Sequence, residues 1–201
     1  MADPRAVEWS RLHHGLDPRS VPLVGPWLRF VWWLARPLRT VPPTAVTAVG
    51  VLAAALAAWL AGPVPGAATA LVMVAALCDA LDGAVAVLAR RASAAGARAD
   101  AVADRICDAL FAVALWRCGA PWPAAVAAGG SAVAVDALRR LRRVPAVVTV
   151  AERPTFTVCA ALACLCAAVT PARWPVAVCA GVWLGAGCVG LAQVGRAPAA
   201  R

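Results

Sequence analysis

Long apolar stretches alternate with short polar or basic stretches along this chain of 201 residues. A helix that crosses a bilayer needs about 20 mostly apolar residues, and the apolar stretches reach or approach that length. Pro, Gly or Arg stands at their ends, as is typical of helix boundaries. The pattern therefore predicts six membrane-spanning helices, over residues 43–61, 67–88, 99–116, 123–138, 155–169 and 175–194.

Aromatic and basic residues are interleaved in the sequence GPWLRFVWWLARPLR, residues 25–39, directly before the first predicted span. This composition is typical of an amphipathic helix that lies in the membrane interface with its rings at headgroup depth. The alternative is an aromatic belt at the start of the first span. We therefore expect an all-α membrane protein with a single domain over residues 1–201, in which residues 1–42 are cytoplasmic or interfacial and residues 43–194 form the bundle.

Composition supports a membrane protein rather than a soluble one. Hydrophobic residues make up 63% of the chain and the mean hydropathy is +0.77, whereas a soluble domain lies nearer half apolar. The net charge is +9, which is compatible with a nucleic-acid partner or a membrane surface. Most of the basic residues lie in short stretches between apolar segments, so we expect lipids, and no nucleic acid, as partners.

The arginines predict the orientation of the spans. They gather before the first span, after the sixth, and in the connections that follow the second and fourth spans, whereas the other connections hold none (residues 62–66) or one each (Arg117, Arg173). By the positive-inside rule, both termini are cytoplasmic. Every basic residue is Arg, and Lys, Asn and Tyr are absent. This bias is typical of GC-rich codons, so we expect the cell membrane of a high-GC bacterium.

Five of the ten acidic residues lie between Cys78 and Leu110, where apolar sequence flanks them on both sides. Asp79 and Asp82 are three residues apart near the end of the second span, and Asp100 and Asp104 are four apart near the start of the third. Each spacing puts its pair on one helix face. A short basic loop joins the two helices, so the four carboxylates can converge.

Four converging carboxylates without partners would repel one another and resist leaving water. A bound divalent cation resolves this repulsion, and oxygen-only ligands favour Mg²⁺ or Mn²⁺ over zinc. Gly83 directly follows the second acid and leaves room for a ligand or a neighbouring backbone. The eight cysteines lie inside or beside apolar stretches and form no CxxC pair, so we interpret them as packing residues rather than disulfide or zinc ligands.

The acids belong to a longer pattern that resembles the signature of the CDP-alcohol phosphotransferase family, also called class I CDP-alcohol phosphatidyltransferases. The matching residues are Asp79-x2-Asp82-Gly83-x2-Ala86-x9-Gly96-x3-Asp100-x3-Asp104. The stretches PTAVTAVG (43–50) and ERPT (152–155) are also similar to segments of this family. The resemblance implies an architecture of six spans preceded by a juxtamembrane helix. A homodimer is compatible with this resemblance.

The resemblance also implies an activity. The enzyme would move a phosphatidyl or related group from a CDP-linked lipid donor, such as CDP-diacylglycerol, to an alcohol acceptor in phospholipid synthesis, and would release CMP. Two divalent ions would be held by the four acids, and Asp104 would also act as the general base. The residues implied to receive the nucleotide and its metal are Thr47, Gly83, Ala86 and Gly96.

The sequence leaves both the function and the acceptor open to alternatives. The signature has Arg after Ala86, where this chain has Val87, and either Arg90 or Arg91 could reach a similar place. A non-catalytic member of the same fold is therefore one alternative function, and a divalent-cation carrier is another. Arg98 and Arg153 are the candidates to bind an acceptor that carries phosphate, and the sequence does not choose between glycerol 3-phosphate, an inositol phosphate and a second lipid.

Overall fold

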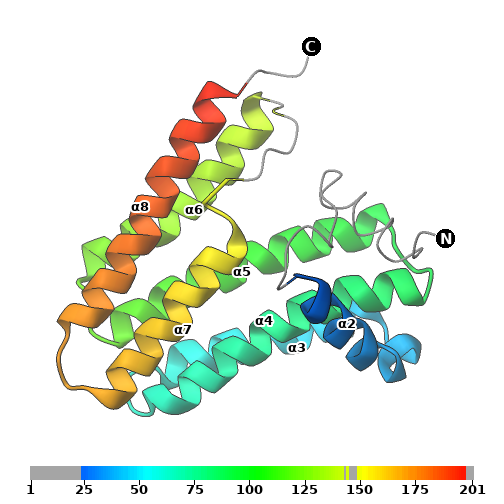
Figure 1. The fold of residues 1–201 in the computed structure, drawn as a ribbon, viewed down its shortest axis with the longest axis horizontal. Coiled ribbons are helices and arrows are strands. Elements are labelled where there is room, and N and C mark those ends of the chain that lie inside the picture. The colour runs from blue at the N-terminus through cyan, green and yellow to red at the C-terminus, as the bar shows by residue number, and fades with distance from the viewer. Residues whose placement is uncertain (1–23, 143, 145–148, 198–201) are drawn as a thin grey trace.

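The structure is a computed structural model that describes residues 24–142, 144 and 149–197. Within these residues it contains seven α-helices, one short 3₁₀ helix and no strand (Figure 1). The elements in chain order are α2 (Val24–Ala35), η1 (Pro37–Thr40), α3 (Pro43–Leu60), α4 (Pro65–Leu88), α5 (Ala94–Arg117), α6 (Trp122–Arg142), α7 (Arg153–Val169) and α8 (Trp174–Arg196). The prediction of an all-α protein is confirmed.

The six apolar stretches coincide with α3 to α8. Pro stands in the first turn of α3, α4, α7 and α8, where its missing N–H is not needed by the helix. Helix α5 begins five residues earlier than predicted, because the Ser93 hydroxyl accepts a 3.1 Å hydrogen bond from the Gly96 N–H and caps the helix. Helix α6 ends four residues later than predicted, at Arg142. The basic run continues the helix, with Asp136 paired to Arg140 at 2.9 Å.

Helix α7 occupies the middle of the bundle. It packs against α4, α5 and α8, while α3 packs against α4 and α5, and α6 against α5 and α8. Figure 1 shows α8 running beside α6, and α7 between this pair and the lower helices α3 and α4. Many fully buried positions at these contacts are alanines, such as Ala54, Ala57, Ala114 and Ala160. Small side chains let helices approach closely, which is how helices associate where lipid surrounds them.

By length and composition, three of the described helices are able to cross a membrane, namely α3, α4 and α8, and α7 is a shorter apolar helix of 17 residues. Large apolar side chains are exposed on the outside of α3, including Leu52, Leu56 and Trp59. These features support a membrane protein. The finer prediction of six spans stays a prediction, because α5 and α6 carry more polar residues.

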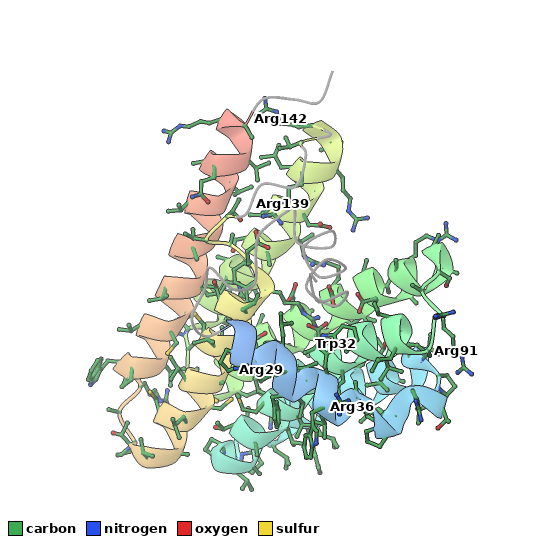
Figure 2. The ribbon with its side chains drawn as sticks, turned by 45° about the vertical axis from the view of Figure 1, so that its right-hand side comes forward. Arg29, Trp32, Arg36, Arg91, Arg139 and Arg142 are labelled. Carbon is green, nitrogen blue, oxygen red and sulfur yellow. The ribbon has the colours of Figure 1, made fainter. Side chains whose placement is uncertain are left out.

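Helix α2 lies across α4 near the end that carries the acids (Figure 2). Its Val31 and Ala35 are buried with Val85 of α4. The same helix exposes a row of aromatic rings, Trp27, Phe30 and Trp33, whose neighbouring rings lie 6.0 and 6.4 Å apart. Its interfacial position stays a prediction. Of the arginines used for orientation, Arg5, Arg11, Arg19, Arg143 and Arg201 lie outside the described residues.

Two glycines of α8 allow the packing between α6 and α8 to be tested. A Cβ added at Gly187 would lie 2.1 Å from Ser131 Oγ and 2.4 Å from Ser131 Cβ, whereas nothing lies within 4 Å of one added at Gly185. Gly187→Ala should therefore lower the free energy of unfolding by about 1–3 kcal/mol through overpacking. Gly185→Ala, on the same helix, should leave it unchanged or raise it by up to about 1 kcal/mol, because Ala favours a helix over Gly. Thermal unfolding in detergent measures both, and equal stability of the two variants would contradict this packing.

Candidate active site

Three of the four signature acids meet between α4 and α5. Carboxylate oxygens of Asp79, Asp82 and Asp100 all lie within 4.8 Å of one another. The convergence follows from the short connection between the two helices. Helix α4 ends in a turn in which the Arg90 N–H bonds to the Val87 carbonyl and the Arg91 N–H to the Ala86 carbonyl, at 3.1 and 2.9 Å. This pattern closes the helix and reverses the chain.

Helix α3 contributes a hydroxyl to the same place. Thr47 Oγ1 lies 2.5 Å from Asp82 Oδ2 and 3.2 Å from the Pro43 carbonyl oxygen. Gly50, one turn further along α3, lets that helix approach α4, because a Cβ there would lie 3.0 Å from Cys78 Cβ. Thr47 and Gly50 line a small pocket together with the acids. The structure thus brings Thr47 to the predicted site.

The fourth acid, Asp104, is held by an arginine. The guanidinium of Arg153, the first residue of α7, forms ion pairs with both Asp104 and Asp79, and only 19% of the Arg153 side chain is exposed. Asp104 therefore lines the pocket but does not join the group of three carboxylates. The sequence predicts Arg153 as a candidate for acceptor binding, and the structure adds that it binds two of the acids directly.

Arg153 is positioned by a network at the start of α7. Glu152, the residue before it, pairs with Arg139 of α6 at 2.6 Å and accepts a 2.9 Å hydrogen bond from the Thr149 N–H. Arg139 also donates to the Thr149 hydroxyl at 2.6 Å. Figure 2 shows Arg139 and Arg142 near the upper end of α6, where Arg142 donates to the Val194 carbonyl of α8. The arginines at the end of α6 therefore fix the position of the first turn of α7 and of the last turn of α8.

The residues fit a hard divalent cation. All the converging donors are carboxylate oxygens, which Mg²⁺ and Mn²⁺ prefer. Asp82 is buried, and Asp100 Oδ1 is buried without a hydrogen-bond partner among the described residues. A buried carboxylate oxygen without a partner carries a large desolvation cost, and a cation bound there would offset it. This combination distinguishes the cluster from an ordinary solvated acidic surface.

The other predicted site residues lie around this centre at different distances. Gly83 is exposed on α4, with open space where a Cβ would be, and Ala86 is half-buried one turn later. Gly96 serves the Ser93 cap. Arg98 is exposed and precedes Asp100 by two residues, so it points away from the face that carries the acids. The structure brings Arg153 to the cluster and leaves Arg98 outside it.

Asp108 continues the acidic face one turn deeper and has a structural partner. It is buried, and its Oδ2 lies 3.3 Å from the Arg105 guanidinium. Asp108 does not line the pocket of the four signature acids. Asp108 therefore pairs with Arg105 on its own helix, outside the group of converging carboxylates.

The turn after α4 bears on the missing signature arginine. Arg90 has a φ of +53°, a left-handed conformation that costs a side-chain-bearing residue about 1 kcal/mol relative to Gly. Arg90→Gly should therefore stabilise the protein by about 1 kcal/mol, whereas Arg91→Gly should not. Chemical or thermal unfolding measures this difference. A less stable Arg90→Gly variant would mean that the Arg90 side chain makes contacts that outweigh the strain, as the relocated function of the signature arginine requires.

Comparisons with known proteins agree with this arrangement. A model of the family described as CDP-alcohol phosphatidyltransferase matches residues 40–190, a range that covers α3 to α7 and most of α8 and includes all four signature acids. No individually curated protein matches the chain. Members of the family use CDP-alcohol donors and depend on divalent cations, which suits a cluster of oxygen ligands. Because the match extends over well more than half of its residues, this chain belongs to the CDP-alcohol phosphatidyltransferase family.

Proposed function

We propose that the protein is an integral membrane enzyme of phospholipid synthesis that transfers a phosphatidyl or related group from a CDP-linked donor to an alcohol and releases CMP. The observation that carries this proposal is the convergence of Asp79, Asp82 and Asp100 from two adjacent helices, inside the range that matches the family. The donor we expect is a CDP-linked lipid such as CDP-diacylglycerol.

The four acids would hold two divalent ions, Mg²⁺ or Mn²⁺. When bound, these ions would neutralise the pyrophosphate of the donor and the charge that develops on the departing CMP. Asp79, Asp82 and Asp100 supply the converging oxygens. The Thr47 hydroxyl orients the Asp82 carboxylate, and the open surface over Gly83 leaves room for the nucleotide beside α4.

Asp104 would act as the general base. Its carboxylate lines the same pocket as the other acids, where it can take the proton of the attacking hydroxyl. Arg153 keeps this carboxylate in place through their ion pair. The Nε–H of Arg153 is buried without a partner within the part of the chain that the structure describes. It is therefore a donor for an acceptor that carries phosphate, and the geometry supports Arg153 over Arg98 in this role.

The predicted orientation completes the proposal. Six spans with both termini in the cytoplasm would put the acids at the cytoplasmic side of a bacterial cell membrane. Helix α2, with its exposed rings and its Arg29 and Arg36 (Figure 2), would lie along the headgroups. A homodimer is compatible with this arrangement.

Reporter fusions test the orientation. A reporter fused after Arg91 or Arg142 should be active in the cytoplasm, because these residues lie at the basic ends of α4 and α6. A reporter fused after Val64 or Ala172, in the connections poor in arginine, should be active outside. An external reporter at Arg142 would contradict the six-span arrangement.

Two other functions are less well supported. A divalent-cation carrier would need helices broken near the membrane centre and a second, symmetric half, whereas α4 and α5 are continuous helices of 24 residues each. A non-catalytic relative, suggested by Val87, would bind metal and CDP-linked lipid without releasing CMP.

Comparison of lipids from cells with and without the gene by mass spectrometry tests the proposed transfer, because the product lipid should disappear with the gene.

A further inference from the structure

Two cysteines from different helices are in contact at the end of the bundle opposite the acids. Cys118 directly follows α5, and Cys164 lies on α7, five residues before its last residue. Their sulfur atoms are 3.6 Å apart, and both thiols are free in the structure. The same two helices are joined near their other ends by the ion pair between Asp104 and Arg153.

The two thiols have complementary properties. Cys164 is fully buried, whereas Cys118 is half-buried and adjoins Gly119 and Ala120, which line an open pocket at this end of the molecule. Cys118 also contacts the Ala61 carbonyl oxygen at 3.5 Å. A hydrogen bond with Cys164 lowers the pKa of the Cys118 thiol. Cys118 is therefore the accessible thiol and the better nucleophile of the pair.

In contrast to the interpretation of all eight cysteines as packing residues, we propose that Cys118 and Cys164 form a disulfide bond that joins α5 to α7 on the outer side of the membrane. The inference rests on the orientation proposed above, which places this end of the bundle outside the cytoplasm, where disulfides form and persist. The sulfur atoms need to approach to about 2 Å. A rotation of the Cys118 side chain, at the end of its helix, can supply this approach.

The oxidant would be an external disulfide, either of an extracytoplasmic oxidoreductase or of a small thiol compound. The Cys118 thiolate attacks one sulfur of this disulfide, which forms a mixed disulfide and releases the first thiol. The Cys164 thiol then loses its proton and attacks Cys118 Sγ. The Cys118–Cys164 bond forms, and the second thiol leaves. Two protein thiols are oxidised and one external disulfide is reduced to two thiols.

The bond would fix the outer ends of α5 and α7 relative to each other. The cytoplasmic ends of these helices carry Asp104 and Arg153, whose ion pair depends on the register between the helices. The disulfide would therefore hold the α5–α7 pair as one unit while α4 and α3 contribute the remaining ligands. It would also constrain the unfolded chain, because it closes a loop between residues 46 positions apart.

Mass spectrometry of the full-length protein tests this bond. Cells are quenched with an alkylating reagent before lysis, so that free thiols are trapped as they exist in the cell. We expect the Cys118 and Cys164 peptides to be linked in most of the protein. Cys159→Ser, which removes another buried cysteine of α7, should keep the link. Alkylated, unlinked Cys118 and Cys164 in the unsubstituted protein would overturn the proposal.

Stability supplies the second measurement. Reduction of the purified protein should lower its Tm by roughly 5–10 °C, and the same reductant should leave the Tm of Cys118→Ser unchanged. A Tm that does not respond to reductant in either protein would contradict a stabilising bond.

The reporter fused after Ala172 separates the failure of the proposed disulfide from the failure of the proposed orientation. An external reporter with free thiols overturns the disulfide alone, whereas a cytoplasmic reporter overturns the orientation and the disulfide together.

Discussion

Replacement of Asp82 or Asp100 by asparagine should abolish CMP release, with a loss of at least about 10³-fold because metal-ion catalysis contributes several kcal/mol, and should remove stabilisation by Mg²⁺. Both carboxylates belong to the group whose oxygens lie within 4.8 Å, and asparagine keeps one neutral oxygen but loses the second oxygen and the negative charge that attracts a hard cation. The helices should still form, since each substitution removes a charge from a buried place and adds no volume. Thermal unfolding with titrated Mg²⁺ and an assay of CMP release measure the two effects.

Asp136→Asn is the matched control for this prediction. Asp136 lies on α6, away from the pocket, and pairs with Arg140, so its replacement should keep both activity and the response to Mg²⁺. Asp108→Asn should be mild in activity, because Asp108 pairs with Arg105 outside the pocket. The metal site is misplaced if Asp82→Asn and Asp100→Asn both respond to Mg²⁺ as the unsubstituted protein does.

Asp104→Asn should behave differently from the other acid variants. It keeps the size of the side chain and one oxygen but loses the basic carboxylate, so turnover should fall by about 10²–10⁴-fold while stabilisation by Mg²⁺ largely persists. The reason is that Asp79, Asp82 and Asp100 converge without Asp104 in the structure. Loss of the Mg²⁺ response in Asp104→Asn would make Asp104 an essential ligand, and loss of activity in Asp108→Asn alone would exchange the two roles.

Arg153→Gln is the companion variant. The Arg153 guanidinium competes with any cation for Asp79 and Asp104, so its removal should tighten the apparent affinity for Mg²⁺ and lower the stability of the metal-free protein, in which four carboxylates then face one another. The KM for a phosphate-bearing acceptor should rise. Arg98→Gln, which changes an exposed arginine, should leave all three quantities close to those of the unsubstituted protein.

The helices could be predicted closely from the sequence because their apolar runs are long and their ends carry Pro or Arg. The two largest differences between predicted and observed helix boundaries have local causes. The basic composition of residues 139–142 predicts a connection, whereas the spacing of Asp136 and Arg140 lets them pair on a helix that continues to Arg142. At the start of α5, Ser93 caps the helix earlier than the apolar pattern predicts, because apolar periodicity begins only after the polar first turn.

The acids could be placed together from the sequence, whereas their partners could not. The spacing of Asp79, Asp82, Asp100 and Asp104 fixes their helix faces, and the short turn between α4 and α5 brings those faces together. The pairing of Arg153 with Asp79 joins residues 74 positions apart, and the pairing of Glu152 with Arg139 depends on how α7 enters the bundle. Contacts of this kind depend on tertiary packing, which the spacing of apolar and polar residues along the chain does not predict.

The most direct test of the metal-dependent transfer is CMP release from CDP-diacylglycerol by the purified full-length protein, measured with and without a chelator. The acceptor mixture contains glycerol 3-phosphate, an inositol phosphate and a phospholipid. We predict CMP release together with a new lipid product, loss of both on addition of chelator, and recovery of both with Mg²⁺ or Mn²⁺. CMP release that the chelator does not reduce would contradict metal-dependent transfer. The absence of CMP release from a protein that Mg²⁺ stabilises would also contradict it.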